Sequence, residues 1–486
     1  MIIDMFFEIV GSAIVALLAV HWVFPSILKI AKVKGLVDNP NARKLQKEPV
    51  PVLGGIAVFF GIVMGMLAYT ALRGNGMDKS VMDMLPVMLG ASVMLYVGSL
   101  DDILGLSPKV RLGLEVVVML GVIFGSGLCV DSLHGLWGME EFSWWIAVPL
   151  TVFAGVGLIN AYNMVDGVNG LSSGLCIACS VIMAVICWKR GDYADCVLSA
   201  CFAASLVPFF MHNVFGRRSK MFIGDGGTMV MGLLMGWYVI RTLSSDNAES
   251  IEDLAANGRE LGLVAMMVAV ASVPVADTLR VMTARMARGV SPFSPDKTHL
   301  HHVFIACGVS HWVTTASEVM INMAVVALWY ATYKMGATVD CQLYVVVAAS
   351  IVMVWGTYFY LSRVVRKHPD SRLLKMTRVT HTSNTAWWTT VQRWLDKGMY
   401  EDYSVVRKNK YNKTNEDMNN NEKDMVAIVN YLQGRGAVEV EEILEQSGAE
   451  RLRIYPILFE LEQEGLIEVV EREALGGAKK VAYAKR

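Results

Sequence analysis

Long apolar stretches recur along this chain and constrain its fold more than any other feature. Each is near the roughly 20-residue length that a helix needs to cross a bilayer. They cover residues 5–28, 52–72, 85–100, 112–130, 144–161, 171–188, 195–212, 226–243, 261–279, 314–334 and 342–362. Only 18% of the residues are charged, against about 25% in soluble domains. We therefore expect an all-α polytopic membrane protein with about eleven transmembrane helices.

The first apolar stretch, residues 5–28, is predicted to be a retained membrane helix rather than a cleaved signal peptide. It lacks a basic segment before the apolar residues, and it contains His21 and Trp22. No small-x-small cleavage site follows it. These features do not match the pattern of a secretory signal.

The loops between the predicted helices form two alternating sets that differ in charge. One set is rich in Lys and Arg and comprises residues 29–51, 101–111, 162–170, 213–225 and 280–313. The other set is poorer in basic residues and richer in acidic ones. Because basic loops stay in the cytoplasm, the first set is predicted to be cytoplasmic and the N-terminus to lie outside. An odd number of spans then places the C-terminal tail in the cytoplasm.

The composition changes after residue 362, which suggests three parts. Residues 1–362 form the predicted membrane domain, and residues 363–424 combine an interfacial segment with a polar linker. The interfacial segment mixes charge with Trp387, Trp388 and Trp394, as amphipathic segments at a membrane surface do. Residues 425–486 form a small module of their own.

The spacing of apolar residues in the module predicts three helices and two strands. The helices are expected near residues 426–432, 440–444 and 452–461, and the strands at 466–470 and 480–483. This order resembles a winged-helix module, a small α+β fold. Its third helix carries Glu460, Glu462 and Glu464, so a protein partner is favoured over DNA.

Polar residues concentrate in five clusters, all in or beside the predicted cytoplasmic loops. The clusters are residues 37–55, 98–111, 160–171, 222–228 and 285–302. In the second, Asp101 and Asp102 follow an apolar stretch directly. A carboxylate within a membrane costs roughly 2.5–3.5 kcal/mol. We therefore expect a metal or a cationic side chain to meet this pair.

The residue types in the clusters suit phosphate binding together with a divalent cation. Carboxylates supply the hard oxygen ligands that Mg²⁺ or Mn²⁺ prefers. Glycines before a helix let backbone N–H groups approach an anion, and Arg and His neutralise a pyrophosphate. These residues are Asp101, Asp102, Asp166, Asp225, Gly224, Gly226, Gly227, Arg285, Arg288, His299, His301 and His302. Taken singly, each cluster could also be a helix cap, a turn or a solvated loop. All five clusters lie on the same predicted side of the membrane, which favours a shared functional site.

The five clusters, in this order, resemble the polyprenyl-phosphate N-acetylhexosamine-1-phosphate transferases. The resemblance covers about residues 1–330, and residues 285–302 are closer to the GlcNAc-1-phosphate branch than to the phospho-N-acetylmuramoyl-pentapeptide branch. It implies a bacterial inner-membrane enzyme that transfers a sugar-1-phosphate from a UDP-sugar to undecaprenyl phosphate and releases UMP. The product would start a lipid-linked envelope glycan such as O-antigen, capsule, enterobacterial common antigen or teichoic acid.

The resemblance also implies roles for individual residues. Catalytic roles fall to Asp101, Asp102, Asp166 and His299, and the Mg²⁺ site falls to Asp225 with help from Asn163. Substrate contacts fall to Arg43, Lys44, Lys109, Arg111, Asn163, Asn169, Arg285, Arg288, His301 and His302. The chain departs from many bacterial relatives at Asn169, where they have Asp, and at Gln46, where they have His. Neither residue is therefore assigned a catalytic role.

Three questions stay open at the level of sequence. The donor is GlcNAc by default, but other UDP-linked aminosugars and a muramoyl-pentapeptide donor fit the same motifs. A homodimer is compatible with the family. A transporter with intramembrane carboxylates and a membrane-tethered regulator are the alternatives from other functional classes.

Overall fold

The structure is a computed structural model of the chain. It describes residues 2–38, 49–73, 79–245, 260–292, 298–367, 385–397, 399, 420–447, 454–455, 457–458, 461–462, 466–472 and 478–483. The chain divides into two compact units, Met1–Tyr400 and Glu401–Arg486, and each is described by itself.

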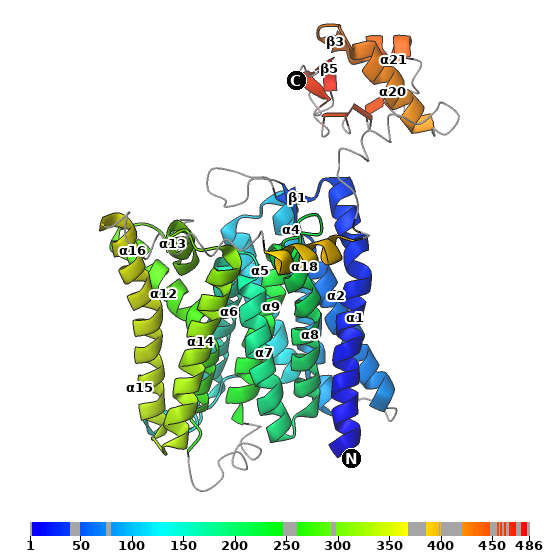
Figure 1. Ribbon diagram of the computed structural model, residues 1–486. Coiled ribbons are helices and arrows are strands. Elements are labelled where there is room, and N and C mark those ends of the chain that lie inside the picture. Colours follow the sequence, from blue (N-terminus) through cyan, green and yellow to red (C-terminus); the bar gives the residue numbers. More distant parts are fainter. Residues whose placement is uncertain are drawn as a thin grey trace. The chain divides into compact units, whose positions relative to one another are not determined.

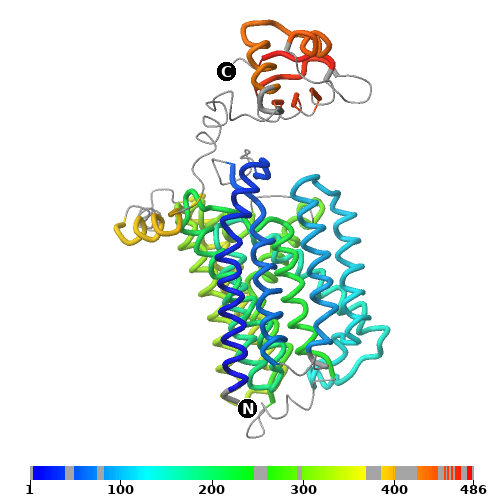
Figure 2. The backbone as a smooth tube through the Cα atoms, turned by 90° about the vertical axis from the view of Figure 1, so that its right-hand side faces the viewer, coloured from blue at the N-terminus to red at the C-terminus, as the bar shows by residue number. Residues whose placement is uncertain are grey.

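The first unit is a bundle of long helices that run side by side (Figures 1 and 2). Its helices are α1 (Ile2–Lys34), α2 (Gly54–Arg73), α3 (Lys79–Asp83), α4 (Leu85–Leu104), α5 (Pro108–Ser126), α6 (Trp144–Val165), α7 (Leu171–Arg190), α8 (Tyr193–Phe215), α9 (Gly224–Leu243), α11 (Leu263–Val270), α12 (Ser272–Ala287), α13 (Leu300–Ala306), α14 (His311–Lys334), α15 (Val339–Ser350), α16 (Thr357–Lys367) and α18 (Ala386–Asp396). A π-helical turn, η3 (Ile351–Gly356), joins α15 to α16, and a 3₁₀ turn, η1 (Leu136–Gly138), lies between α5 and α6.

Eight helical segments in the described part of the chain are long and apolar enough to cross a membrane. The bent pair α11 and α12 provides a ninth if it counts as one span. The chain is thus a multi-pass membrane protein, while the total of about eleven spans stays a prediction. The two remaining stretches are α5, which carries Lys109, Arg111 and Glu115, and α9, which begins with a polar glycine-rich turn.

The predicted span 261–279 is a pair of helices bent by 75° between α11 and α12. The side chain of Asn322 on α14 satisfies the backbone groups that the break leaves free. Its amide nitrogen donates to the carbonyl of Val270 at 3.0 Å, and its oxygen accepts from the N–H of Val273 at 3.1 Å. A break inside a membrane bundle requires partners of this kind, because no water is present to supply them.

Helix α9 lies in the middle of the bundle, where it contacts α2, α4, α6, α7 and α11. Its residues are buried almost continuously from Gly226 to Leu243, as expected for a helix that is apolar on all sides. Helices α4 and α9 pack closely against each other at Gly98 and Gly226. A Cβ at residue 98 would lie 2.3 Å from the backbone of Gly226, so this crossing excludes larger residues.

Four helix ends meet at one end of the bundle. Helix α4 ends at Leu104 and α6 ends at Val165, while α5 begins at Pro108 and α9 begins at Gly224. Ser107 and Pro108 are typical of a helix start, and the Ser107 hydroxyl accepts the N–H of Val110 at 3.4 Å. We call this end, which holds Asp101 and Asp225, the carboxylate end, and the opposite one the far end. A short antiparallel pair, β1 (Val37–Asp38) and β2 (Val50–Pro51), leads into α2.

The far end includes the turn η1, which is fixed by α15. The N–H of Trp137 donates to the carboxylate of Asp340 at 2.7 Å. The neighbouring Cys341 is exposed, whereas the other seven cysteines of the chain are buried. All eight cysteines lie in the described part of the chain, and none of them forms a disulfide.

In the second unit, the described residues include two helices and a three-stranded sheet; the predicted third helix, near residues 452–461, lies largely outside the described residues. The described elements are α20 (Asn420–Leu432), α21 (Val440–Ser447), β3 (Val438–Glu439), β4 (Ile467–Arg472) and β5 (Ala478–Tyr483), with strand order β3-β5-β4. The strand β3 was not predicted from the sequence. The hydrophobic core of the second unit includes Ile428, Leu432, Ile443, Ile454, Ile457, Leu458, Leu461 and Val481. The assignment to the winged-helix class stays a prediction.

Candidate active site

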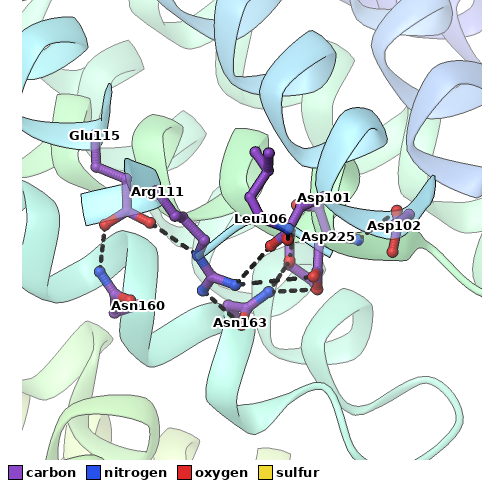
Figure 3. A network of polar contacts seen from close by, with 9 residues as sticks. Asp101, Asp102, Leu106, Arg111, Glu115, Asn160, Asn163 and Asp225 are labelled. Atoms are coloured by element: carbon purple, nitrogen blue, oxygen red, sulfur yellow. Dashed lines mark hydrogen bonds and ion pairs between the residues drawn. The ribbon is translucent and has the colours of Figure 1, made fainter. Parts of the chain in front are cut away.

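Arg111 is the centre of a polar network at the carboxylate end of the bundle (Figure 3). Its Nη1 lies 3.3 Å from Oδ2 of Asp101 and 3.8 Å from Oδ2 of Asp225. Its Nη2 donates to Oδ1 of Asn163 at 2.9 Å. Because these residues come from α4, α5, α6 and α9, the fold brings together three separate sequence clusters. The expectation that a cation meets the carboxylates is confirmed for Asp101.

Asn163 connects this network to the first turn of α9. Its Nδ2 donates to Oδ1 of Asp225 and to Oγ1 of Thr228, both at 2.8 Å. The Asp225 side chain is 37% exposed, against 11% for Asp101. Asp225 is therefore the carboxylate of this pair that is more open to a ligand.

Asp102 faces the N-terminus of α9 rather than Arg111. Its Oδ2 accepts the backbone N–H of Asp225 at 2.9 Å. Gly224 has a positive φ of 74°, and a Cβ there would lie 2.5 Å from the same carboxylate oxygen. In this structure Asp102 thus caps α9 and fixes the backbone of Asp225, as negative groups at helix N-termini do.

One residue of the network, Glu115, was missed by the sequence analysis. Glu115 is fully buried, and its carboxylate accepts from Nε of Arg111 at 3.2 Å and from the side chain of Asn160. Arg111 and Glu115 are four residues apart on α5, a spacing at which opposite charges meet on a helix. A charged residue inside an apolar stretch was the available signal.

The loop after α6 carries Asp166, whose carboxylate accepts the hydroxyl of Ser172 at 2.6 Å. Burial raises the pKa of Asp166 to about 6, because the charged form loses solvation. Asn169, in the same loop, is held through its backbone. Its N–H donates to His311 at 3.3 Å, and its carbonyl accepts from Thr315 at 2.9 Å.

Gly167 joins this loop to the histidine cluster. A Cβ at residue 167 would lie 2.2 Å from Nε2 of His301, so only glycine permits this contact. His301 is almost fully buried. Burial and the neighbouring His302 lower its pKa well below the usual value for histidine. His301 is therefore neutral at pH 7.

Asp277, which was also missed, organises the rest of the histidine cluster. Its Oδ2 lies 2.9 Å from Nδ1 of His299, and its Oδ1 accepts from Nη2 of Arg280 at 2.6 Å. The N–H of Leu300 donates to the same Oδ1 at 3.1 Å. Asp277 lies in a stretch that was interpreted as a membrane span, which is why its polar partners could not be foreseen.

The remaining predicted residues differ in burial. Arg285 is buried and donates to the carbonyl of Pro292 at 2.6 Å, while Arg288 and Lys109 are exposed. Arg43, Lys44 and Gln46 lie outside the described residues.

The oxygen atoms of this site suit a hard cation that takes only a few of its ligands from the protein. Among the residues that the structure describes, no three His, Cys, Asp or Glu side chains form a metal-binding group. Mg²⁺, however, is commonly held by one or two carboxylates together with substrate phosphates and water. Asp225, with the amide of Asn163 beside it, fits that mode.

Comparison with known proteins identifies the family of the chain. Residues 84–243 match glycosyl transferase family 4. The chain is 30% identical over 312 residues to the undecaprenyl-phosphate alpha-N-acetylglucosaminyl 1-phosphate transferase of Escherichia coli O157:H7, covering 62% of this chain and 78% of that protein. It is 32% identical over 314 residues to the probable undecaprenyl-phosphate N-acetylglucosaminyl 1-phosphate transferase of Bacillus subtilis strain 168, covering 63% and 79%. The chain therefore belongs to glycosyl transferase family 4.

Proposed function

We propose that this protein transfers a sugar-1-phosphate, by default GlcNAc-1-phosphate, from a UDP-sugar to undecaprenyl phosphate. The observation that carries the proposal is the convergence of Asp101, Arg111, Asn163 and Asp225 at one end of the bundle. The relatives named above are transferases of GlcNAc-1-phosphate to the same acceptor. The enzyme would start a lipid-linked glycan on the cytoplasmic side of the bacterial inner membrane.

In the proposed reaction, an oxygen of the lipid phosphate attacks the β-phosphorus of the donor. The bond between that phosphorus and the oxygen bridging to the α-phosphate breaks, and UMP leaves with the bridging oxygen and its electron pair. A lipid pyrophosphate that carries the sugar remains. Such phosphoryl transfers depend mainly on positioning and charge neutralisation.

The residues of the network have distinct proposed tasks. Asp225 and Asn163 would hold Mg²⁺, which would supply positive charge to neutralise the pyrophosphate and the leaving group. Arg111 neutralises the lipid phosphate, and Asp101 orients Arg111 through their ion pair. Asp102 fixes the backbone of Asp225. Electrostatic stabilisation is strongest where donors are held in place beforehand, and these mutual contacts do so.

The histidine cluster is the proposed site for the donor. Asp277 holds His299, and Gly167 brings His301 next to the Asp166 loop. Arg285, Arg288 and His302 are the other residues that we assign to the donor, and Asp166 is assigned to the nucleotide. We assign recognition of the sugar to the histidine cluster and its neighbours rather than to the Arg111 network.

A transporter is the competing proposal from another class, and the placement of the carboxylates argues against it. Carrier sites lie near the middle of the bilayer, commonly where helices are interrupted. Asp101 is in the last turn of α4, and Asp225 is in the first turn of α9. Both therefore lie at a membrane boundary, where a lipid headgroup and a soluble nucleotide can meet.

The test is UMP release by the purified protein with undecaprenyl phosphate, Mg²⁺ and a panel of UDP-sugars. We expect release with one donor, and loss of release with EDTA or with Asp101→Ala or Asp225→Ala. Transfer of the labelled sugar to the lipid must accompany UMP, because UMP without lipid-linked sugar would indicate hydrolysis. Folded protein that is silent with every donor would overturn the proposal.

Two variants sharpen this experiment. Asp340→Ala removes a carboxylate–backbone bond at the far end, so it should retain the activity and serves as the matched control. Asn169→Asp should be tolerated, because the contacts of Asn169 are made by its backbone. Complete loss with Asn169→Asp would show that its amide contacts the nucleotide.

A further inference from the structure

Residues 216–223 connect α8 to α9 and determine where Asp225 lies. The second half of this loop is fixed by the strand β2 and the start of α2. The N–H of Phe222 donates to the carbonyl of Pro51 at 2.7 Å, and the N–H of Gly55 donates to the carbonyl of Ile223 at 2.7 Å. The first half is fixed differently, by a residue near the end of α18.

Asp396, in the last turn of α18, binds this first half through a single carboxylate oxygen. Its Oδ1 accepts the backbone N–H groups of Arg217, Arg218 and Ser219 at 3.3, 3.1 and 2.9 Å. It also accepts the hydroxyl of Ser219, which is fully buried, at 2.8 Å. Successive backbone N–H groups that converge on one anion form a strong, geometrically specific site. Here the anion belongs to the same chain.

Helix α18 is itself seated against the bundle. Leu395 is buried, and the ring of Phe215, the last residue of α8, contacts Trp387 and Trp388 with centroid distances of 5.6 and 4.8 Å. The hydroxyl of Thr385 caps the helix by accepting the N–H of Trp388 at 3.4 Å. Both Figures 1 and 2 show α18 lying across the direction of the long helices.

Two tryptophans of α18 are largely exposed, although one edge of Trp387 contacts Phe215. Trp387 and Trp394 are 62% and 64% exposed. They are seven residues apart, which places them on one side of the helix, two turns apart. Tryptophan is enriched where a protein crosses the boundary between lipid and water, and Phe215 ends a candidate membrane span at this level. The occupant of this face is therefore the interfacial region of the lipid bilayer.

We propose that Asp396 is a positioning residue for Asp225, and that α18 anchors it in the membrane interface. A few contacts connect Asp396 to Asp225. Asp396 binds the backbone of residues 217–219, and the side-chain amide of Asn213 donates to the carbonyl of Met221 at 2.8 Å. Gly224, with its positive φ, then turns the chain into α9. A shift of the loop would move Asp225 relative to Asp101 and Arg111. The inference rests on the proposed function, because it assigns Asp225 to the reaction.

The test compares the full-length Asp396→Ala, Asp396→Asn and Asp340→Ala proteins with wild type. For Asp396→Ala we expect kcat to fall by about ten- to a hundredfold, because a displacement near 1 Å costs up to two orders of magnitude. KM for the UDP-sugar should change little, and the Mg²⁺ concentration for half-maximal rate should rise. Asp396→Asn keeps one acceptor oxygen and should recover part of kcat.

Hydrogen exchange separates positioning from general destabilisation. Asp396→Ala should speed exchange in residues 217–225 and leave α14 unchanged, whereas Asp340→Ala should leave 217–225 unchanged. Wild-type kcat together with wild-type exchange in Asp396→Ala would overturn the inference. If the wild-type protein turns over no UDP-sugar, the proposed function fails, while the exchange comparison still decides whether Asp396 holds the loop.

The lipid contact of α18 has its own measurement. In vesicles with brominated acyl chains, tryptophan fluorescence of wild type should be quenched more than that of the Trp387→Phe/Trp394→Phe variant. Equal fractional quenching would show that these side chains do not reach lipid. The anchoring half of the inference would then be wrong.

Discussion

Gly98 lies so close to Gly226 that a Cβ on residue 98 would come within 2.3 Å of the Gly226 backbone. This contact sets the separation of α4 from α9, and therefore the separation of Asp101 from Asp225. Gly98→Ala should separate the two helices. We expect a loss of about 1–3 kcal/mol of stability, as for other overpacked sites, and a large loss of UMP release.

Gly121→Ala on α5 is the matched control for this substitution. A Cβ at residue 121 would meet nothing within 4 Å, and alanine favours a helix over glycine by about 1 kcal/mol. Its unfolding temperature should be unchanged or raised, with activity retained. If Gly98→Ala behaved like Gly121→Ala, the close crossing would not control the site.

Arg111→Lys should lower activity although the charge is kept. The guanidinium contacts Asp101, Glu115 and Asn163 through three different nitrogens, and one ammonium cannot reproduce that geometry. We expect UMP release to fall about tenfold or more, the equivalent of one charge-assisted hydrogen bond.

A second substitution separates stability from activity at this position. Glu115 is fully buried, so Arg111→Lys should also destabilise the protein by weakening the partner of a buried charge. Adding Glu115→Gln should restore the unfolding temperature but not the activity. Recovery of both would mean that Arg111 only stabilises the fold.

Removal of divalent cations should stop turnover without unfolding the protein. Arg111 already lies between Asp101 and Asp225, so their mutual repulsion is offset when no metal is bound. We expect the same thermal unfolding curve with Mg²⁺ and with EDTA, while UMP release is lost only in EDTA. A marked fall in unfolding temperature in EDTA would instead assign the metal a structural role.

Ser172→Ala should move the acid limb of the pH profile to higher pH. Burial raises the pKa of Asp166 to about 6, and the Ser172 hydroxyl opposes that rise because it bonds to the charged form. Without the hydroxyl the pKa of Asp166 rises further. We therefore expect kcat/KM of wild type to fall below about pH 6, and the midpoint to be higher in the variant.

The fall in kcat/KM at acid pH should not be caused by unfolding of the protein. A carboxyl whose pKa is raised on folding stabilises the folded state at low pH, and this contribution is lost as the pH rises through the folded pKa. Protonation of Asp166 therefore favours folding below pH 6. Ser126→Ala, at the far end of α5, should leave the midpoint unchanged. A midpoint that moved to lower pH would contradict the assignment.

The meeting of Asp101, Asn163 and Asp225 could be foreseen because each lies at the end of an apolar stretch. Charge asymmetry between loops then assigns those ends to one side of the membrane. The mutual contacts could not be foreseen. Asp102 follows Asp101 directly, yet it binds the backbone of Asp225 rather than Arg111. Only the orientation of α4 about its axis decides which carboxylate faces which partner.

Residues inside the apolar stretches escaped the sequence analysis for a different reason. Glu115 and Asp277 are stabilised by partners that become neighbours only through packing. The bend between α11 and α12 likewise depends on Asn322, which is about fifty residues further along the chain. Hydropathy predicts the length of an apolar stretch. It does not predict a bend in the helix where a side chain, such as that of Asn322, takes the hydrogen bonds that the backbone no longer makes.

The exposed Cys341 gives this protein a natural reporter of its topology. It is the one exposed thiol among eight, and the bond between Asp340 and Trp137 places it at the far end of the bundle. A membrane-impermeant maleimide added to intact cells should therefore label the unmodified protein at a single position, and Cys341→Ser should abolish the labelling. If labelling required disrupted cells instead, the far end would face the cytoplasm and the carboxylate end would face away from the nucleotide pool.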